Sequence, residues 1–258
     1  MGTLVGVTLY ARTAAEAKDG FGRAYGRMAE LNRLLSDYEP GSELNQLGTA
    51  PRRVSPELYT ILRFARGVSE ASGGAFDVTV GPLTRLWRAR MPITQEARAL
   101  VDWREVHLYR GRVWLGRPGM RLDLGAIGKG FAADEMLRTL RNMGISRALI
   151  AASGDIVCGD APPDSAGWQV EAGGRRLTLR RAAVSTSGDS TQFYERDGRR
   201  YSHILDPRKG VALSDVLEVS VVAANGMTAD ALATAARVLG LAAARAVVRK
   251  YKAKLVVE

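Results

Sequence analysis

Cysteine is nearly absent from this sequence, and no stretch of apolar residues is long. The single cysteine, Cys158, excludes an intrachain disulfide and a zinc site built from cysteines. No apolar run reaches the length that a membrane-spanning helix needs. The first residues also lack the basic, then apolar, then small-residue order of a secretory leader. We therefore expect a cytoplasmic protein, or a periplasmic or membrane-anchored one whose leader was removed before this numbering begins.

Histidine is scarce as well, whereas arginine is abundant. Only His107 and His203 occur, and the formal net charge is +10 at pH 7. Such a charge suits an anionic ligand, an acidic partner or nucleic acid, and it equally suits a solvated basic surface. The basic residues are scattered, and the sequence contains no zinc-finger, RNA-recognition or basic-zipper pattern. We therefore predict no nucleic-acid partner and no membrane span.

Composition and local patterns indicate a folded globular chain. Hydrophobic residues make up 46% of the 258 residues, which is enough for a sizeable core, so we expect one domain over 1–258, with two intertwined subdomains as the alternative. Residues 3–10 alternate apolar and polar as a strand does. A capping box at Thr13 and Glu16 predicts a helix over 13–35, although three glycines weaken it. A Ser-Pro pair begins a helix over 55–74 and a Gly-Gly pair ends it.

The rest of the chain reads as short strands mixed with helices. We expect strands at 106–109, 113–115, 120–123, 149–152, 216–222 and 254–257, others leading to Ile204, and helices from Lys129 to Gly144, from Thr228 and from Ala242. Because these elements interleave without strict alternation, we predict an α+β fold of mixed sheets with packed helices rather than a doubly wound one.

A glycine-rich stretch at residues 122–131 joins a predicted strand to a predicted helix. Glycines let the backbone approach a ligand closely, and the free N–H groups of a helix N-terminus attract an anion. Lys129 adds a positive charge that suits a phosphate. The spacing fits neither the P-loop nor the dinucleotide fingerprint, so an ordinary turn remains the alternative.

A late predicted helix carries Asp230 and Thr234, which are four residues apart and therefore share one face. A carboxylate and a hydroxyl so placed offer two hard oxygens to Mg²⁺, an ion that takes its other ligands from water and phosphates. The alternative is purely structural: an acidic residue in the first turn favours the helix dipole, and a helical threonine bonds its own backbone.

A third segment, Tyr201–Gly210, contains one of the two histidines. His203 is followed by Asp206, a proline and a cationic pair, which could place an imidazole, a carboxylate and positive charges around a phosphate. A hairpin turn with a surface histidine is the equally open alternative. His107 lies in an apolar strand pattern, so we expect it to be structural.

Taken in order, these and several looser motifs resemble the FAD:protein FMN transferases of the ApbE type over nearly the whole chain. The motifs are Met1-Gly2-Thr3, Ser36-Asp37-Tyr38 with Ser42-Glu43-Leu44, Gly74-Ala75-Phe76-Asp77, the Asp123–Gly130 turn, Ser153-Gly154-Asp155-Ile156, Thr186-Ser187-Gly188, His203–Gly210 and residues 229–234. No single motif is diagnostic, and the resemblance rests on their joint order.

The resemblance implies an enzyme that takes FAD and Mg²⁺, transfers FMN through a phosphoester bond to a Ser or Thr hydroxyl of an acceptor protein, and releases AMP. It implies that Asp230 and Thr234 bind the metal with their side chains, beside the backbone carbonyl of Ala126. His203 becomes the candidate catalytic base, with Asp206 as its orienter or as an alternative base. The implied FAD contacts are Met1, Tyr38, Asp77, Lys129, Gly154, Asp155 and His203.

Two positions depart from the family pattern, and the reaction itself has alternatives. Lys209 stands where a hydroxyl residue is common, and Ser153 stands where glycine is usual. The same residues would also serve a Mg²⁺-dependent FAD diphosphatase that makes FMN and AMP, or a flavin-binding protein without catalysis. The family's acceptors carry an Asp-x-x-Ser/Thr-Gly-Ala-Ser/Thr segment; this chain contains none, so we expect a separate acceptor protein.

Overall fold

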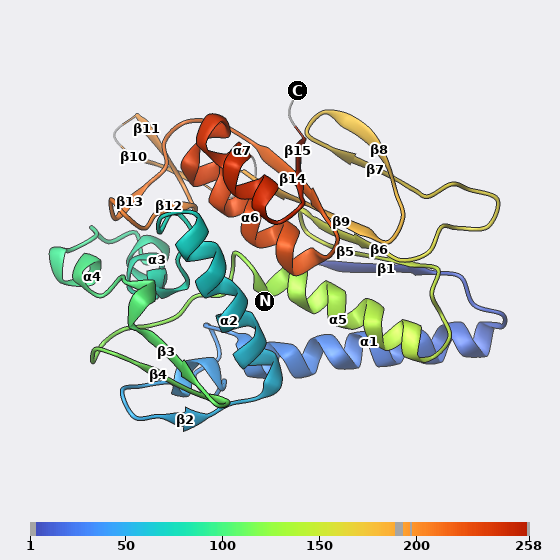
Figure 1. The fold of residues 1–258 in the computed structure, drawn as a ribbon, viewed down its shortest axis with the longest axis horizontal. Helices are drawn as coiled ribbons and strands as arrows, with labels where there is room; N and C mark the ends of the chain where they lie inside the picture. Colours follow the sequence, from blue (N-terminus) through green and yellow to red (C-terminus); the bar gives the residue numbers. More distant parts are fainter. Residues whose placement is uncertain (1–3, 189–192, 197, 257–258) are drawn as a thin grey trace.

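The computed structural model describes residues 4–188, 193–196 and 198–256 (Figure 1). Met1, one of the expected FAD contacts, lies outside the described residues, as do the predicted first and last strand residues, Thr3 and Val257. In the described part of the chain, no helix is both long and apolar enough to cross a membrane.

A six-stranded sheet forms the centre of the molecule, and its neighbouring strands all pair antiparallel. The strand order is β1 (Val5–Leu9), β5 (Ala148–Ala152), β6 (Asp155–Cys158), β9 (Ala182–Ser187), β14 (Val219–Ala223) and β15 (Lys254–Val256). Alternate side chains of these strands point to opposite faces, so both faces need a cover.

Helices cover one face of the sheet (Figure 1). Over the central strands lie α5 (Gly128–Asn142) and α6 (Gly226–Leu239), which also pack against each other. On either side of them, α1 (Ala14–Leu35) lies along α5 and reaches β1, and α7 (Leu241–Lys250) contacts α6 and β15, while α2 (Pro56–Ala71) packs against α6. The opposite face is covered by the hairpin of β7 (Trp168–Ala172) and β8 (Arg175–Leu179), whose apolar side chains pack on Ile156 and Val184.

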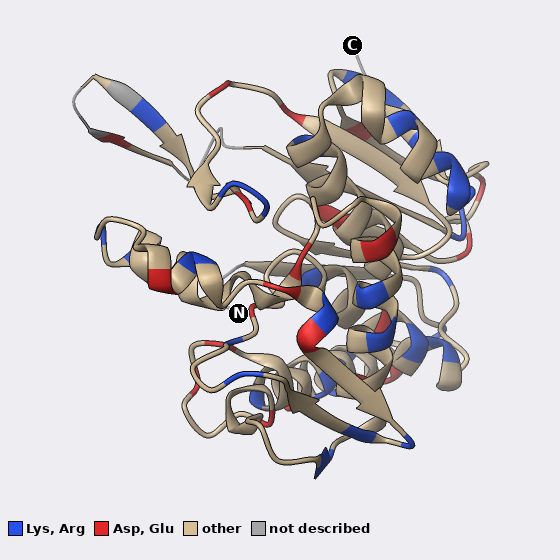
Figure 2. Cartoon of the chain, turned by 60° about the vertical axis from the view of Figure 1, so that its left-hand side comes forward, with Lys and Arg blue, Asp and Glu red and all other residues tan. Residues whose placement is uncertain are grey.

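Smaller elements lie at one end of this body. They are the three-stranded sheet of β2 (Arg52–Arg53), β4 (Arg112–Leu115) and β3 (Val106–Tyr109), the short helices α3 (Gly81–Arg88) and α4 (Gln95–Ala99), and the hairpins β10–β11 (Phe193–Arg196, Arg199–Ser202) and β12–β13 (Leu205–Asp206, Val211–Ala212). In the view of Figure 2 the β10–β11 hairpin projects from the body, and lysines and arginines are scattered over many elements.

Several predicted elements need correction. Residues 120–123 form no strand: Met120 and Leu122 are buried as alternation predicts, but the segment has no partner strand. The strand predicted at 216–222 begins only at Val219, and the helix predicted from Thr228 begins at Gly226, because Asn225 caps it by accepting the Thr228 N–H at 2.9 Å. Helices α3 and α4 were not predicted.

The glycines of α1 do not interrupt that helix, and Thr13 caps it as predicted, accepting the Glu16 N–H at 3.1 Å. Gly20 lies buried where a Cβ would come within 2.9 Å of the Ile145 side chain. Glycine therefore lets α1 approach the end of α5 closely, and packing outweighs its low helix propensity.

Candidate functional site

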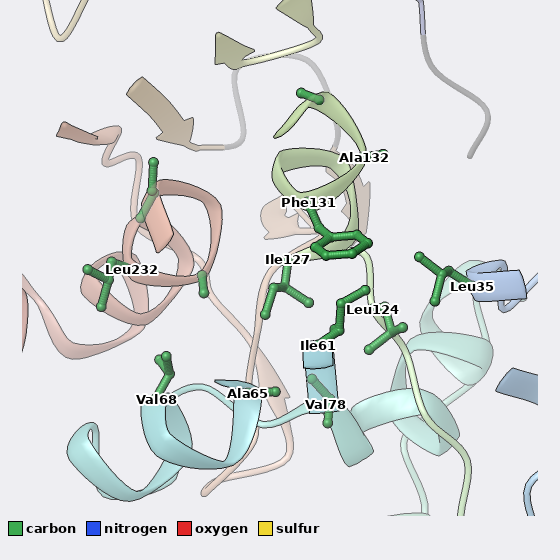
Figure 3. Close-up of a cluster of buried hydrophobic side chains, with 14 of the residues drawn as sticks. Leu35, Ile61, Ala65, Val68, Val78, Leu124, Ile127, Phe131, Ala132 and Leu232 are labelled. Atoms are coloured by element: carbon green, nitrogen blue, oxygen red, sulfur yellow. The ribbon is translucent and has the colours of Figure 1, made fainter. Parts of the chain in front are cut away.

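The glycine-rich turn is held between the helices by a buried apolar floor. Leu124, Ile127 and Phe131 point from the turn and the start of α5 towards α2, while Leu232 approaches from α6 (Figure 3). Above this floor, Asp123 closes the turn by accepting the Gly125 N–H at 2.8 Å. Core packing and this hydrogen bond therefore fix the position of the turn.

Two glycines bring α5 and α6 into backbone contact. A Cβ on Gly130 would lie 2.2 Å from the Gly226 carbonyl oxygen, and a Cβ on Gly226 would lie 2.5 Å from that of Gly130. Asp134 of α5 adds two bonds, accepting the N–H groups of Gly226 and Met227 at 2.7 and 2.8 Å. This close approach puts the first turn of α5 against the first turn of α6, directly before Asp230.

Lys129 consequently lies between two buried aspartates. Its ammonium is 3.1 Å from Asp155 Oδ2 at the start of β6 and 3.2 Å from Asp230 Oδ1 on α6. It also donates to the Gly125 carbonyl at 2.9 Å, and the Gly130 N–H donates to Asp230 Oδ2 at 3.0 Å. The structure therefore joins three of the predicted site residues, which we call the Lys129 cluster (Lys129, Asp155 and Asp230).

Negative charge is in excess within the Lys129 cluster. Burial and the nearby charge of Asp155 raise the pKa of Asp230, although Lys129 and the Gly130 N–H oppose this. Burial lowers the pKa of Lys129, but the charges of Asp230 and Asp155 outweigh it and the net shift is upward. The excess itself follows from the contacts, since two carboxylates share one ammonium.

Asp155 is oriented by a residue that the sequence did not single out. Ser185 of β9, its register partner across the sheet, donates a hydrogen bond to Asp155 Oδ1. Apart from the Lys129 ammonium, which lies 3.1 Å away, Asp155 Oδ2 has no hydrogen-bond partner among the described residues. Ser185 and Ser187 alternate along β9, a pattern that is typical of a polar strand face. This pattern does not identify Asp155 as the partner of Ser185.

Thr234 lies one turn after Asp230 on α6, so the predicted helix is confirmed. Its hydroxyl is 3.5 Å from that of Ser187 on β9. A carboxylate, a hydroxyl and a backbone carbonyl are hard oxygen donors, which suit Mg²⁺. In the described residues no group of three or more His, Cys, Asp or Glu side chains gathers, so a metal here must use such hydroxyl and carbonyl oxygens as well. The donor set around Asp230 fits this ion.

The segment Tyr201–Gly210 runs from the end of β11 into the tight β12–β13 hairpin, which packs against α6. Asp206 is buried, and it accepts from the Arg208 backbone N–H, Nε and Nη2 at 3.0, 3.0 and 2.9 Å. Ile204 packs with Val238, which follows Thr234 by one helical turn on α6. His203 is half-buried directly before Ile204, so the packing of Ile204 on Val238 places His203 near the last turns of α6.

The hairpin also contacts the Gly74–Asp77 motif. Ala75 belongs to the same apolar cluster as Ile204, and the Arg208 side chain lies over Gly74. Asp77 is largely buried and accepts from the Thr79 N–H and hydroxyl and from the Trp103 N–H. Burial raises its pKa to about 6 against these three hydrogen bonds. Asp77 thus shapes the loop around the motif.

Tyr38 belongs to a separate network that reaches the glycine-rich turn. Its ring is exposed, and the Arg88 guanidinium lies 4.3 Å from the ring centre. Arg88 also donates to Asp37 and, at 2.8 Å, to Asp123 Oδ2. The sequence did not single out Arg88, because α3 itself was not predicted.

Comparison with known proteins identifies the family. A family model described as the ApbE family matches residues 1–257. The chain belongs to the ApbE family. It is 36% identical to a Treponema pallidum FAD:protein FMN transferase over 97% of this chain and 80% of the relative, and 30% identical to one from Klebsiella pneumoniae over 97% and 79%.

Solved ApbE structures share the fold. The flavin transferase ApbE from Vibrio cholerae superposes with a TM-score of 0.87 at 28% identity, covering 99% of this chain and 89% of that one. The ApbE protein from Thermotoga maritima superposes with a TM-score of 0.86 at 27% identity, covering 98% and 90%. The predicted α+β fold and the predicted family are both confirmed.

The two departures from the ApbE pattern have structural consequences. Ser153 adopts a left-handed backbone conformation with φ of 55°, which glycine takes without strain and serine does not. Gly154 then passes so close to β9 that a Cβ would be 2.9 Å from the Thr186 carbonyl. Lys209 is exposed and lies 3.8 Å from Asp206, beside the shorter pair with Arg208.

Proposed function

We propose that this ApbE-family protein transfers FMN from FAD to a Ser or Thr hydroxyl of an acceptor protein, with Mg²⁺, and releases AMP. The observation that carries the proposal is the Lys129 cluster, a buried set of one ammonium and two carboxylates beside the glycine-rich turn. The names of the relatives support the same activity.

The reaction balances as a substitution at phosphorus. The acceptor hydroxyl oxygen attacks the phosphorus on the FMN side of the FAD diphosphate, the bond to the bridging oxygen breaks, and AMP leaves with that oxygen. The hydroxyl proton passes to a base. Asp230, Thr234 and the Ala126 carbonyl would hold Mg²⁺, which when bound offsets negative charge on the diphosphate.

The remaining roles are those that the resemblance implies. We assign the base to His203, which lies directly before Ile204, a residue that packs on α6. Asp206 has both carboxylate oxygens engaged by Arg208, which suits an orienting role better than proton removal. Tyr38, Asp77 and Gly154, together with Met1, are the proposed FAD contacts.

Intact-mass analysis tests the proposal directly. A small acceptor domain with the Asp-x-x-Ser/Thr-Gly-Ala-Ser/Thr segment is incubated with this protein, FAD and Mg²⁺. We expect the acceptor mass to rise by one FMN less water, and no rise when both Ser/Thr residues of the segment are replaced by Ala.

Two other outcomes would replace the proposal. AMP released at full rate without acceptor would indicate the FAD diphosphatase. Tight FAD binding that is indifferent to Mg²⁺ and to Asp230→Ala would indicate a flavin-binding protein without catalysis.

A further inference from the structure

The contacts of Lys129 engage its whole ammonium group. Three oxygen-bearing groups lie within 3.2 Å of Nζ: the Gly125 carbonyl, Asp155 and Asp230. An ammonium has three donors and no acceptor. In this arrangement Lys129 has no donor left to offer to a phosphate, so its proposed contact with FAD requires it to leave at least one carboxylate.

A divalent cation on Asp230 would make the same demand. Magnesium binds carboxylate oxygens at about 2.1 Å, so it would stand within roughly 5 Å of an ammonium that is itself 3.2 Å from Asp230 Oδ1. The repulsion between the two cations is strong at that distance in a partly buried site. Ammonium and metal ion therefore compete for Asp230.

The net charge of the Lys129 cluster changes when a cation and a diphosphate bind. Asp155 and Asp230 contribute two negative charges and Lys129 contributes one positive charge, which leaves one negative charge in the cluster. A bound divalent cation would change the net charge of the cluster from one negative to one positive charge. The two negative charges of a diphosphate would then make the net charge negative again. Asp155 stays in place because Ser185 holds its Oδ1, while its Oδ2 faces the Lys129 ammonium at 3.1 Å.

From these contacts we propose that Lys129 competes with the divalent cation for Asp230, so that the cation binds tightly only when a diphosphate draws the ammonium away. Metal binding and FAD binding are then coupled through one side chain, and the protein does not bind Mg²⁺ tightly without its substrate. This inference rests on the metal site of the proposed function.

Magnesium titration of the nucleotide-free protein by calorimetry tests the competition without any measurement of activity. Lys129→Gln keeps donors for the carboxylates but removes the charge, and Lys129→Met removes both. We expect both variants to bind Mg²⁺ about tenfold more tightly than the wild type, or better, within the usual range of coupling between two ligands. Lys18→Met, the same change at an exposed position of α1, should bind as the wild type does.

The outcomes separate this inference from the proposed function. If both Lys129 variants bind Mg²⁺ as weakly or as tightly as the wild type while Asp230→Asn abolishes binding, the metal site stands and the competition is wrong. If none of the proteins binds Mg²⁺, the metal site and the competition both fail. Circular dichroism of Lys129→Gln, the more conservative variant, confirms that a folded protein is being measured.

Discussion

The Lys129 cluster and the Asp206–Arg208 hairpin both pair a buried aspartate with a cation, but they are built in different ways. Lys129 and Asp230 are 101 residues apart and meet only through the packing of two helices. Asp206 and Arg208 are two residues apart within one turn, and Arg208 is exposed. The first pair depends on the whole fold, whereas the second depends on a local conformation. We therefore expect the cluster to govern ligand binding and stability. The segment before the hairpin should govern the chemical step, because it carries His203, the proposed base.

The largest effect that we expect is a loss of transfer rate, without a matching loss of FAD affinity, when His203 is replaced. Replacing His203 by Ala should slow FMN transfer by about 10²–10⁴-fold, because a general base typically contributes that much. FAD affinity should change little, whereas Asp230→Asn should weaken Mg²⁺-dependent FAD binding. Transfer rates by intact mass and FAD affinities by fluorescence check the pair. Equal losses of rate and affinity in His203→Ala would contradict the assigned role.

Matched removal of the two cations compares their contributions to stability. Lys129→Met leaves two buried carboxylates uncompensated, so we expect the free energy of unfolding in the absence of Mg²⁺ to fall by about 3 kcal/mol. Arg208→Met should cost about 1 kcal/mol, because the pair is partly exposed and Asp206 keeps its backbone hydrogen bond. Urea denaturation measures both. Similar losses in the two variants would remove the distinction between the regions.

Helix contact can be tested with two glycines that differ only in their surroundings. Gly130→Ala places a Cβ against the backbone of α6, so we expect a loss of about 1–3 kcal/mol and weaker Mg²⁺ binding. Gly22→Ala lies in α1 with open space around it, so it should stabilise the protein by about 0.5–1 kcal/mol. Thermal denaturation of the two variants gives the comparison. If Gly130→Ala is tolerated, the close approach of α5 and α6 is not required.

The smallest effect that we expect is the change of the free energy of unfolding with pH that Asp134 causes. Asp134 accepts hydrogen bonds from the first residues of α6. Burial raises the pKa of Asp134 to about 6, above its ordinary value of 3.8, although two backbone N–H groups oppose the shift. The folded protein binds the proton more tightly, so this contribution to stability is present below pH 4 and is lost as the pH rises through 6. The full difference between these two pKa values corresponds to about 3 kcal/mol. Because Asp134 is half-buried and solvent screens part of its charge, we expect a loss of about 1–2 kcal/mol.

Asp134→Asn isolates that contribution, because the amide does not titrate. The free energy of unfolding, measured by urea denaturation between pH 4 and 7, should fall less steeply with pH in the variant than in the wild type. Identical slopes would show that Asp134 titrates normally in the folded protein.

Local signals in the sequence accounted for most of the helices and for the first pattern of the site. The capping residues Thr13 and Ser55 start α1 and α2 as predicted, and the shared face of Asp230 and Thr234 follows from helical spacing alone. These features depend on residues within one or two turns of each other. The helix caps and the shared face of Asp230 and Thr234 can therefore be predicted without the tertiary structure.

Only the tertiary structure decided which of these residues meet. The sheet register places Ser185 beside Asp155, the contact of Gly130 with Gly226 sets Lys129 against Asp230, and Arg88 reaches Asp123 from a helix that the sequence did not reveal. An ion pair between distant segments leaves no periodic trace in either of them. The sequence alone determined most of the helices and the candidate donors. The packing of α5 and α6 on the sheet decided that two carboxylates share one ammonium, because only that packing brings the charges within a few ångströms.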